Sequence, residues 1–421
     1  MLKQLEGSQG VAQAVALCRP DVVCAYPISP QTHIVENLGL LCRKGILKDC
    51  EYINVESEFA AMSVAIGASV AGGRAYTATA SQGLLYMVEA VYNAGGLGLP
   101  IVMTVANRAI GAPINIWNDH SDSMSQRDSG WIQLFAETNQ EACDLHIQAF
   151  RIAEEVSLPV MVCMDGFVLT HAFERMDIPT QEEVDAFLPP YEPRQVLDPA
   201  NPYSIGAMVG PEAFTEVRWL AHHRMLDALD VISHTSEAFE KQFGRQSGGL
   251  VSSYRMDDAE VVVLAMGSML GTIKDSVDEM RDAGFKIGVL SLKCYRPFPY
   301  AAVRDALKGA KKVIVMERMV SAGTGGALCL DVMKALKGLA IEQYSVVAGL
   351  GGRAVTRASL KKVFNEAFAG TLSDDTVFLD LDQELVTRQL ERERSIRHVG
   401  PVAEALNRHV NERKIARGEE I

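Results

Sequence analysis

The chain has 421 residues, of which 48% are hydrophobic and 22% are charged, and its formal net charge is −13 at pH 7. Domains average about 150 residues, so a chain of this length is expected to form two or three of them. An acidic chain without a block of Lys and Arg lacks the clustered positive charge that phosphate backbones attract, which argues against nucleic acid as a partner.

The eight cysteines are scattered, and none belongs to a CxxC pair or to the closely spaced run that ligates an iron–sulfur cluster. We expect them to be reduced. No charged and apolar leader opens the chain, and the apolar run 158–169 is interrupted by Pro159 and Asp165, well short of the roughly twenty residues that span a bilayer. The sequence therefore predicts a cytoplasmic protein without a membrane span, in which any iron–sulfur cluster is held by another chain.

The first predicted elements are a helix over 6–20 and a buried strand over 21–26. The strand stops at Tyr26-Pro-Ile-Ser-Pro30, where two prolines flank Ser29 and restrict the backbone at the strand's carboxyl end. Ser29 is therefore a candidate for a rigidly held site residue. A plain turn explains the same residues equally well.

Alternating strands and helices between residues 50 and 95 predict a parallel sheet. Its first strand, 50–55, is followed by two carboxylates, Glu56 and Glu58, and then by a tightly packed apolar helix. Glu58 is thus expected where a strand gives way to a helix N-terminus.

A second strand over 74–80 leads to Ser81 and Gln82, and a helix is expected over 84–95. Ligands of a parallel sheet gather at the carboxyl ends of its strands. Ser81, Gln82 and Glu58 are therefore candidates for one site.

A buried strand over 100–108 places Asn107 and Arg108 at the same kind of strand end, before a polar and aperiodic stretch. Such a stretch inside a domain is usually functional or an interface. Arg108 can bind a carboxylate through its planar fork of donors. The alternative is a structural ion pair with Asp119 or Asp122.

The first α/β domain is expected to end near residue 175, after a helix over 140–155 and a strand over 159–164. A proline-rich excursion follows, and then a long helix over 212–243.

A second α/β unit is predicted from a strand that begins at Glu260 and leads into the turn Gly267-Ser268, and from strands over 286–292 and 311–317. The glycine-rich turn 323–326 follows the last of these strands and precedes a helix, so its amides could hold an anion, although close helix packing explains the glycines as well. The charged tail over 383–421 is predicted to be helical and suited to subunit contacts.

A buried glutamate at position 56 or 58 is expected to have a raised pKa, because burial disfavours the charged carboxylate. A carboxyl that stays protonated at neutral pH can donate a hydrogen bond to a ring nitrogen, which is the partner that thiamine diphosphate needs at its pyrimidine. The other interpretation is that both glutamates favour the helix N-terminus as capping charges. The residues alone leave both interpretations, and the choice between the two glutamates, open.

No metal site is predicted from the histidines, because His222 and His223 are adjacent and His33, His120 and His171 are isolated in the sequence. The Gly-Asp-Gly pattern with a following Asn pair, which anchors magnesium and diphosphate in thiamine enzymes, is also missing from the chain. A thiamine site here would therefore be completed by another chain.

Several stretches of the sequence resemble the α subunit of the 2-oxoacid:ferredoxin oxidoreductases, the pyruvate synthase group. In the order of that family, they are Tyr26–Pro30, Glu56–Met62, Thr79–Gly83, Ala106–Ala109, Ala112–Asp122, Tyr295–Pro299, Glu317–Arg318 and Gly349–Thr356.

The resemblance implies an α/β fold in three parts. They are a thiamine diphosphate-binding domain of the pyrimidine type over 1–240, a transketolase C-terminal-like α/β domain over 255–380, and the charged tail over 381–421. It also implies a β subunit that carries the diphosphate-binding domain and shares thiamine diphosphate and Mg²⁺ with this chain. A γ subunit and a ferredoxin-like subunit with iron–sulfur clusters would complete the complex, with FAD on a further subunit where electrons go to a nicotinamide.

The implied activity is the oxidative decarboxylation of a 2-oxoacid to acyl-coenzyme A, with electrons passed to iron–sulfur clusters. By motif position, Glu58 matches the glutamate that contacts the aminopyrimidine, Arg108 the arginine that holds the oxoacid carboxylate, and Ser29 a hydroxyl residue near the substrate. The resemblance also implies that Asn107 contacts the substrate. It implies that the cofactor is contacted by Tyr26, Pro27, Ile28, Ser81 and Gln82.

The sequence departs from the family pattern at three positions. Similar chains generally carry Thr at the position of Ser29 and His at that of Phe59, and often Ser at that of Gly111. The smaller Ser29 and Gly111 predict more room for substrate, and so an oxoacid bulkier than pyruvate, such as phenylglyoxylate. Two other functions fit the same order of domains: a non-redox thiamine-dependent transferase or decarboxylase, and a non-catalytic assembly subunit.

Overall fold

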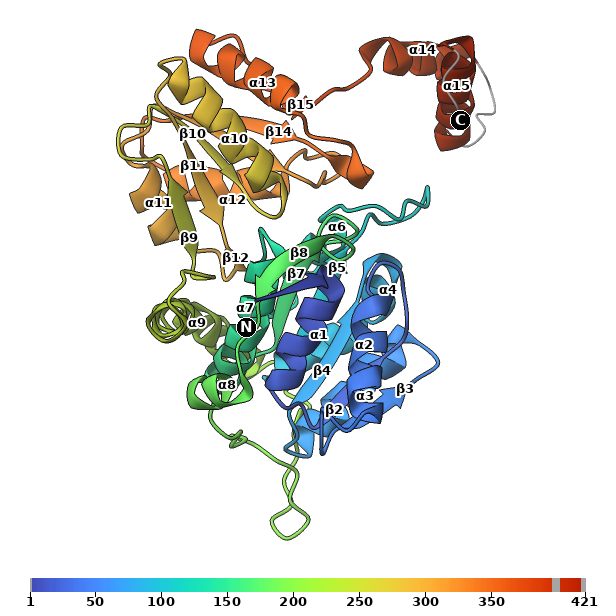
Figure 1. The fold of residues 1–421 in the computed structure, drawn as a ribbon, viewed down its shortest axis with the longest axis vertical. Coiled ribbons are helices and arrows are strands. Elements are labelled where there is room, and N and C mark those ends of the chain that lie inside the picture. The colour runs from blue at the N-terminus through green and yellow to red at the C-terminus, as the bar shows by residue number, and fades with distance from the viewer. Residues whose placement is uncertain (1, 396–401, 418–421) are drawn as a thin grey trace. The chain divides into compact units, whose positions relative to one another are not determined.

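The computed structural model describes residues 2–395 and 402–417, which form two compact units that divide after Val377. The larger unit contains two large sheets and one small one, and the smaller unit contains two helices (Figure 1). In the part of the chain that the structure describes, no helix is both long and apolar enough to cross a membrane.

The first large sheet has seven strands in the order β12-β6-β7-β5-β4-β2-β3, and all of its pairs are parallel except that of β12 with β6. The strands are β2 Val22–Ala25, β3 Glu51–Asn54, β4 Ala75–Thr79, β5 Val102–Asn107, β6 Ile132–Phe135, β7 Val160–Asp165 and β12 Cys294–Arg296. The predicted parallel sheet is confirmed. The central strands are buried on both faces, as expected for strands covered by helices on either side.

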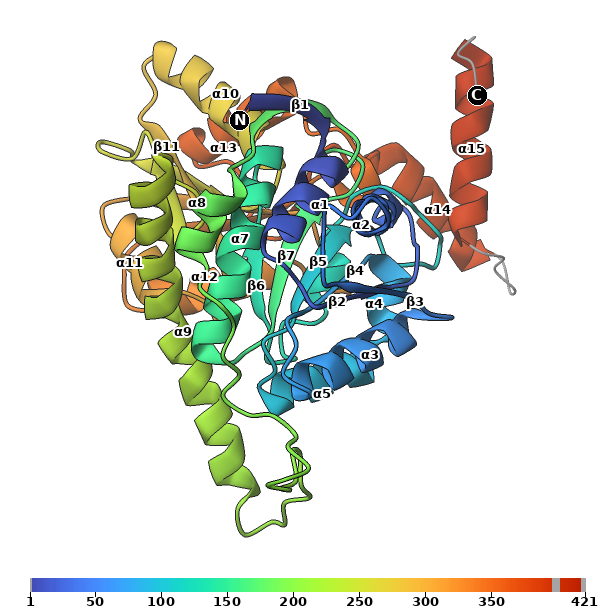
Figure 2. The same cartoon turned by 60° about the horizontal axis from the view of Figure 1, so that its bottom comes forward.

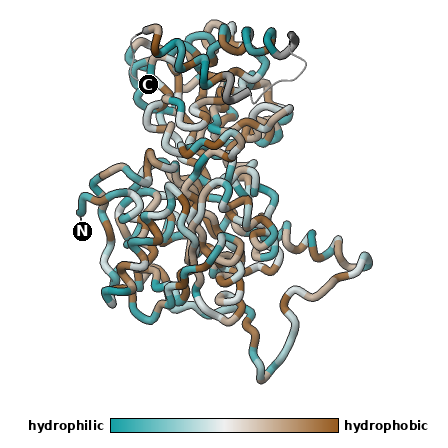
Figure 3. Tube along the Cα trace, turned by 90° about the vertical axis from the view of Figure 1, so that its right-hand side faces the viewer, coloured by the Kyte–Doolittle hydropathy of each residue, from teal (hydrophilic) through white to brown (hydrophobic). Residues whose placement is uncertain are grey.

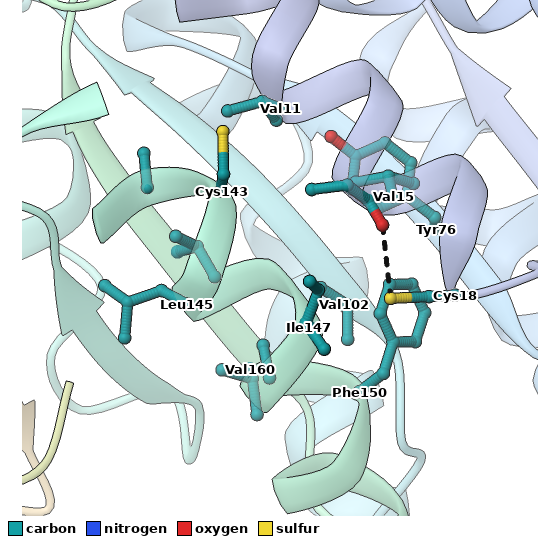
Figure 4. Close-up of a cluster of buried hydrophobic side chains, with 14 of the residues drawn as sticks. Val11, Val15, Cys18, Tyr76, Val102, Cys143, Leu145, Ile147, Phe150 and Val160 are labelled. Atoms are coloured by element: carbon teal, nitrogen blue, oxygen red, sulfur yellow. Dashed lines mark hydrogen bonds between the residues drawn. The ribbon is translucent and has the colours of Figure 1, made fainter. Parts of the chain in front are cut away.

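One face of this sheet is covered by α1 (Gly7–Leu17), α2 (Thr32–Arg43), α7 (Asn139–Val156) and the long α9 (Phe214–Phe243) (Figures 1 and 2). Figure 4 shows how side chains of α1 and α7 meet there above strand residues such as Tyr76, Val102 and Val160. The Cys18 thiol, just after α1, donates to the Ala14 carbonyl at 3.3 Å. Cys18 is buried and forms no disulfide.

The other face is covered by α3 (Glu58–Val70), α4 (Ser81–Tyr86) and α5 (Val88–Leu97). Helix α3 begins where predicted, because the Ser57 hydroxyl caps it by accepting from Ala60 N at 3.2 Å. The single helix predicted over 84–95 is instead two short helices that meet at Met87.

Residues 2–6 and 166–213 carry elements that the sequence patterns did not suggest. The short strands β1 (Leu2–Glu6) and β8 (Phe173–Asp177) pair in an antiparallel two-stranded sheet, and α8 (Gln181–Phe187) begins with a capping box formed by Thr180 and Glu183. The excursion that follows α8 projects away from the first sheet (Figure 1), and Figure 2 shows that the start of α9 projects with it. Figure 3 shows that this projecting segment includes apolar positions.

The second large sheet has six strands in the order β15-β14-β13-β10-β11-β9. They are β9 Val251–Tyr254, β10 Val261–Ala265, β11 Ile287–Leu292, β13 Lys312–Glu317, β14 Glu342–Val347 and β15 Val377–Phe378. Helices α10 (Met269–Asp282) and α13 (Arg357–Ala369) pack together on one face, and α11 (Tyr300–Leu307) and α12 (Ala327–Leu336) on the other. A 3₁₀ turn, η1 (Leu350–Gly352), follows β14.

The chain returns from the second large sheet to the first at β12, which directly follows the β11 segment and pairs with β6 of the first sheet. Lys293, just before β12, is buried and places its Nζ 2.7 Å from Glu141 Oε2 and 3.1 Å from Glu137 Oε2. Burial lowers the pKa of Lys293, but the two carboxylates outweigh it and leave the pKa raised. Glu137 also accepts from Lys274 of α10 at 2.6 Å, so the cluster joins the two sheet regions.

Lys293→Met is expected to lower the stability of the chain by about 3–5 kcal/mol, because Glu141 would be left as a buried charge without a cation. Thermal unfolding of the full chain measures this. The matched control is Lys308→Met, since Lys308 is 70% exposed and its pairing with Asp305 is a surface pair worth roughly 0–1 kcal/mol. Equal melting temperatures for the two variants would contradict the prediction.

The smaller unit consists of α14 (Gln383–Ser395) and α15 (Val402–Arg417). Arg413 of α15 donates to Asp382 at 2.6 Å and to Glu384 at 2.9 Å, which joins the two helices through charged side chains. The prediction that the charged tail is helical is confirmed over these residues. The part of that prediction that falls on 396–401 and 418–421 lies outside the described residues.

Candidate active site

The carboxyl ends of four parallel neighbours, β7, β5, β4 and β2, lie at one edge of the seven-stranded sheet. The chain leaving three of them carries residues singled out from the sequence: Ser29 after β2, Ser81 and Gln82 after β4, and Arg108 after β5. Glu58 follows β3 and starts α3. The fold therefore brings the predicted residues to a common edge.

Glu58 lies against the start of α4. A Cβ atom added to Gly83 would be 2.7 Å from Glu58 Oε1 and 2.6 Å from Thr79 Oγ1, so only glycine leaves room for this carboxyl. Glu58 is buried, whereas Glu56 is exposed. Among the described residues, none forms a hydrogen bond or ion pair with the Glu58 carboxyl, and Thr79 Oγ1 beside it also has no partner. A buried carboxyl without a hydrogen-bond partner is free to form a hydrogen bond with a bound molecule.

Ser81 and Gln82 connect β4 to the segment after β5. The Ser81 hydroxyl lies 2.5 Å from both the Ala109 carbonyl and Gln82 Oε1. Gln82 Nε2 occupies the space beside Gly111, where an added Cβ would be only 2.5 Å from it. The room that Gly111 leaves is therefore filled by Gln82, which weakens the expectation that the small residue at this position enlarges the substrate site.

Arg108 and the loop after β2 are in direct contact. Arg108 Nη1 donates to the Ser29 carbonyl at 2.9 Å, and Nε donates to the Asn115 carbonyl at 3.3 Å. Burial lowers the pKa of Arg108, and Asp122 partly opposes this. Within the described ranges, no carboxylate pairs with the Arg108 guanidinium. The alternative of a structural ion pair with Asp119 or Asp122 is wrong, because Asp119 accepts from the amides of Ser121 and Gly351, and Asp122 from the backbone amide of Arg108 and not from its side chain.

Asp122 is a site residue that the sequence interpretation missed. Its Oδ2 accepts from the backbone amides of Ser81 and Arg108, both at 2.9 Å, and its Oδ1 from Asn107 Nδ2 at 2.8 Å and Ser123 N at 2.7 Å. Burial raises the pKa of Asp122 to about 6 in spite of these donors. One carboxylate thus fixes the ends of β4 and β5 relative to each other. The polar stretch after β5 was the only signal for it.

The remaining predicted residues lie at different depths. Tyr26, Pro27 and Ser29 are exposed and Ile28 is half-buried, in a loop held by Gln31, which accepts from Ile28 N and donates to the Ala78 carbonyl. Asn107, by contrast, is completely buried and donates to Asp122 and Ser123. These contacts favour a supporting role for Asn107 over direct contact with a ligand.

A charged network ties this edge to the second sheet. Asp165, at the end of β7, lies 2.8 Å from His120 Nε2 and 2.9 Å from Arg318 Nη1, and it accepts from Ser268 N at 2.7 Å. Burial alone would raise the pKa of Asp165, but Arg318 and His120 outweigh it and the pKa is lowered. His120, isolated in sequence, is therefore a buried member of this network.

Just after the glycine-rich turn, two backbone amides at the start of α12 are occupied by the Glu317 carboxyl. Glu317 Oε2 accepts from Leu328 N at 2.9 Å and Oε1 from Cys329 N at 3.1 Å, and a Cβ on Gly326 would overlap the same carboxyl. Close packing is thus favoured over an anion site as the reason for these glycines. Burial raises the pKa of Glu317 to about 7.

This raised pKa predicts a pH dependence of stability. The folded chain binds a proton at Glu317 more tightly than the unfolded chain does, so the contribution is complete below the ordinary glutamate pKa and is lost as pH rises through about 7. The loss is expected to be about 3 kcal/mol. Melting temperatures of the wild type and Glu317→Gln, compared from pH 5 to 8, measure it: the wild type should lose more stability with rising pH than the variant. Parallel curves would contradict the assignment.

Comparison with known proteins gives the family. Residues 13–237 match the model for the thiamine diphosphate-binding domain of pyruvate flavodoxin/ferredoxin oxidoreductases, and residues 259–360 match core domain II of pyruvate:ferredoxin oxidoreductase. The pyruvate synthase subunit PorA of Methanosarcina barkeri is 47% identical over 390 residues, which cover 91% of this chain and 97% of that protein. The ketoisovalerate oxidoreductase subunit VorA of Pyrococcus abyssi is 39% identical over 364 residues, covering 86% and 92%.

A solved structure, that of 2-oxoglutarate:ferredoxin oxidoreductase from Magnetococcus marinus with 2-oxoglutarate, coenzyme A and succinyl-CoA bound, has the same fold. The TM-score is 0.65 at 18% identity, and the match covers 87% of this chain and 65% of the solved one. The expected fold class, a thiamine diphosphate-binding α/β domain followed by a second α/β region, is confirmed. The chain therefore belongs to the 2-oxoacid:ferredoxin oxidoreductase family.

Proposed function

We propose that this chain is the α subunit of a pyruvate:ferredoxin oxidoreductase, which converts pyruvate and coenzyme A into acetyl-coenzyme A and carbon dioxide and passes two electrons to iron–sulfur clusters. The observation that carries the proposal is that two buried side chains at one sheet edge lack an oppositely charged partner. Glu58 is a buried carboxyl without a partner, and Arg108 is a buried guanidinium without a carboxylate, in the described part of the chain.

The residues at this edge fit the pyrimidine half of thiamine diphosphate. The space that Gly83 leaves holds the Glu58 carboxyl beside Thr79, and both carry oxygens without hydrogen-bond partners in the described residues. Glu58 would hold a proton toward a pyrimidine ring nitrogen, and the loop Tyr26–Ile28 with Ser81 and Gln82 would line the ring. When bound, the cofactor supplies the nucleophilic carbon that adds to the keto group of the substrate.

Arg108 would hold the substrate carboxylate. Its guanidinium is anchored through the Ser29 and Asn115 carbonyls, which leaves other N–H groups for a planar, charge-assisted contact with an anion. Ser29 would add a hydroxyl hydrogen bond. Fixing the carboxylate in this way orients the keto group before reaction, which is a large part of the rate gain in positioned reactions. Asn107 would act through Asp122, by keeping the strand ends in place.

Other components of the complex are proposed from the family. We propose a β subunit that binds the diphosphate and Mg²⁺, a γ subunit, and a ferredoxin-like subunit, with FAD only where a nicotinamide is the acceptor. The excursion after α8 and the start of α9 offer a surface that such partners could cover. Large apolar side chains are exposed along this surface, namely Leu197, Tyr203, Met208, Val209, Phe214, Val217, Trp219 and Leu220. We also keep the domain boundaries 1–240, 255–380 and 381–421 as a proposal.

Purification of the native complex without oxygen tests the function. An artificial electron acceptor would be offered together with coenzyme A and each of pyruvate, 2-oxoisovalerate, 2-oxoglutarate and phenylglyoxylate. We expect the fastest reduction with pyruvate, together with bound thiamine diphosphate and iron. A preference for phenylglyoxylate would support the bulkier substrate instead. Thiamine without iron, and no reduction with any oxoacid, would favour the non-redox transferase or decarboxylase.

A further inference from the structure

Three side chains far apart in the sequence converge near the start of α2. Glu6 ends β1, His33 is the second residue of α2, and His171 lies between β7 and β8. One ligand-capable atom from each lies within 4.8 Å of the other two. The sequence placed these histidines as isolated residues, and only the pairing of β1 with β8 beside α2 brings them together.

The contacts within the cluster are close. His33 Nδ1 lies 2.6 Å from Glu6 Oε1, and the centroids of the His33 and His171 rings are 4.6 Å apart. The Glu6 side chain is buried, while that of His33 is 44% exposed, so the cluster opens to solvent on the side of His33. Two imidazoles and one carboxylate are ligands that Zn²⁺ and similar first-row ions prefer, whereas Mg²⁺ and Ca²⁺ prefer sites made of oxygen.

The backbone around the cluster is held rigidly. Ser8 donates to the Thr170 carbonyl through its amide at 3.0 Å and its hydroxyl at 2.8 Å, and Gly7 N donates to the Ala172 carbonyl at 3.0 Å. These bonds fix the residues next to Glu6 against those next to His171. Thr170 Oγ1 lies 2.8 Å from His171 Nδ1 and so orients that ring, which is the kind of outer contact that metal-ligating histidines usually have.

We propose that Glu6, His33 and His171 form a binding site for a divalent ion of the zinc class. The ion would replace the proton that His33 and Glu6 share, take one ligand atom from each residue, and complete its coordination with water. It would tie β1, the start of α2 and the segment between β7 and β8 to one point. None of these three residues is among those assigned to the cofactor or the substrate, and the proposal does not depend on the reaction that the complex catalyses.

Titration of the full-length chain with zinc chloride, after removal of metals with a chelator, tests the site. We expect one equivalent of Zn²⁺ to stay with the chain through gel filtration and to raise its melting temperature, and we expect no comparable effect from Mg²⁺. His33→Asn and His171→Asn should each weaken zinc binding by more than about tenfold, since even outer-shell partners are worth roughly 10- to 100-fold.

The matched control is His223→Asn, because His223 is an exposed histidine on α9 that pairs with Asp227. It should bind zinc as the wild type does. Melting of each variant without metal shows whether it is folded, and the milder Thr170→Val variant gives a second measurement if either histidine variant is not. Absence of zinc binding by the folded wild type would overturn the proposal. Equal zinc binding by the wild type and both histidine variants would also overturn the proposal, because the zinc would then be bound by other groups such as the cysteines.

Discussion

Replacing Glu58 by Gln is expected to reduce turnover with pyruvate by roughly 10²- to 10⁴-fold, the range typical for loss of a positioned proton-transfer group. The amide has nearly the shape of the carboxyl, so it fits the space beside Gly83 and leaves the fold intact. It cannot hold or release the proton that the pyrimidine nitrogen requires. The measurement is pyruvate-dependent reduction of an artificial acceptor by the assembled complex, with subunit composition determined in parallel.

Glu56→Gln provides the matched control, because it makes the same chemical change two residues earlier at an exposed side chain. This variant is expected to keep normal turnover. Near-normal activity of Glu58→Gln in a complex of full composition would remove Glu58 from the mechanism. Loss of activity in both variants would indicate that the helix N-terminus, and not one carboxyl, is what matters.

The large elements of the fold follow from local patterns that are strong in this sequence. Central strands such as β5 and β7 are continuous apolar runs buried on both faces, and α7 has a clear amphipathic period, so each was predicted within a few residues. Strand β6 was missed because Ile132–Phe135 is too short to establish a period after a polar stretch. Its pairing with β7, and that of β12 with β6, are long-range contacts that no local pattern encodes.

The residues of the candidate site likewise fall into those that local patterns predict and those that depend on long-range contacts. Glu58, Ser29 and Arg108 were found because they follow strands, and the ends of parallel strands share an edge. The role of Asp122 was not found, because it depends on where a loop returns to place one carboxylate against amides from two strands. The cluster of Glu6, His33 and His171 was not predicted either, because its members are far apart in the sequence and come together only in the folded chain.

The second large effect is expected at Arg108. Arg108→Met should raise the KM for pyruvate and lower kcat/KM by about 10²- to 10³-fold, since a charge-assisted contact with the carboxylate is worth roughly 1.5–3 kcal/mol and mispositioning adds to the loss. Arg108→Lys keeps the charge but not the planar fork, so an intermediate loss is expected. Steady-state kinetics of the assembled complex over a range of pyruvate concentrations separates KM from kcat.

A purely structural role for Arg108 predicts a different pattern. The guanidinium also donates to the Ser29 and Asn115 carbonyls, so its removal could disturb the loop after β2. In that case Arg108→Met would lower the melting temperature and would affect KM no more than kcat. Arg127→Met, which removes a half-buried arginine of the same segment paired with Asp128, controls for loss of positive charge and should leave both constants unchanged. A carboxylate-binding arginine instead requires that the KM rise while thiamine diphosphate binding stays normal, because the role proposed for Arg108 is to bind the substrate and not the cofactor.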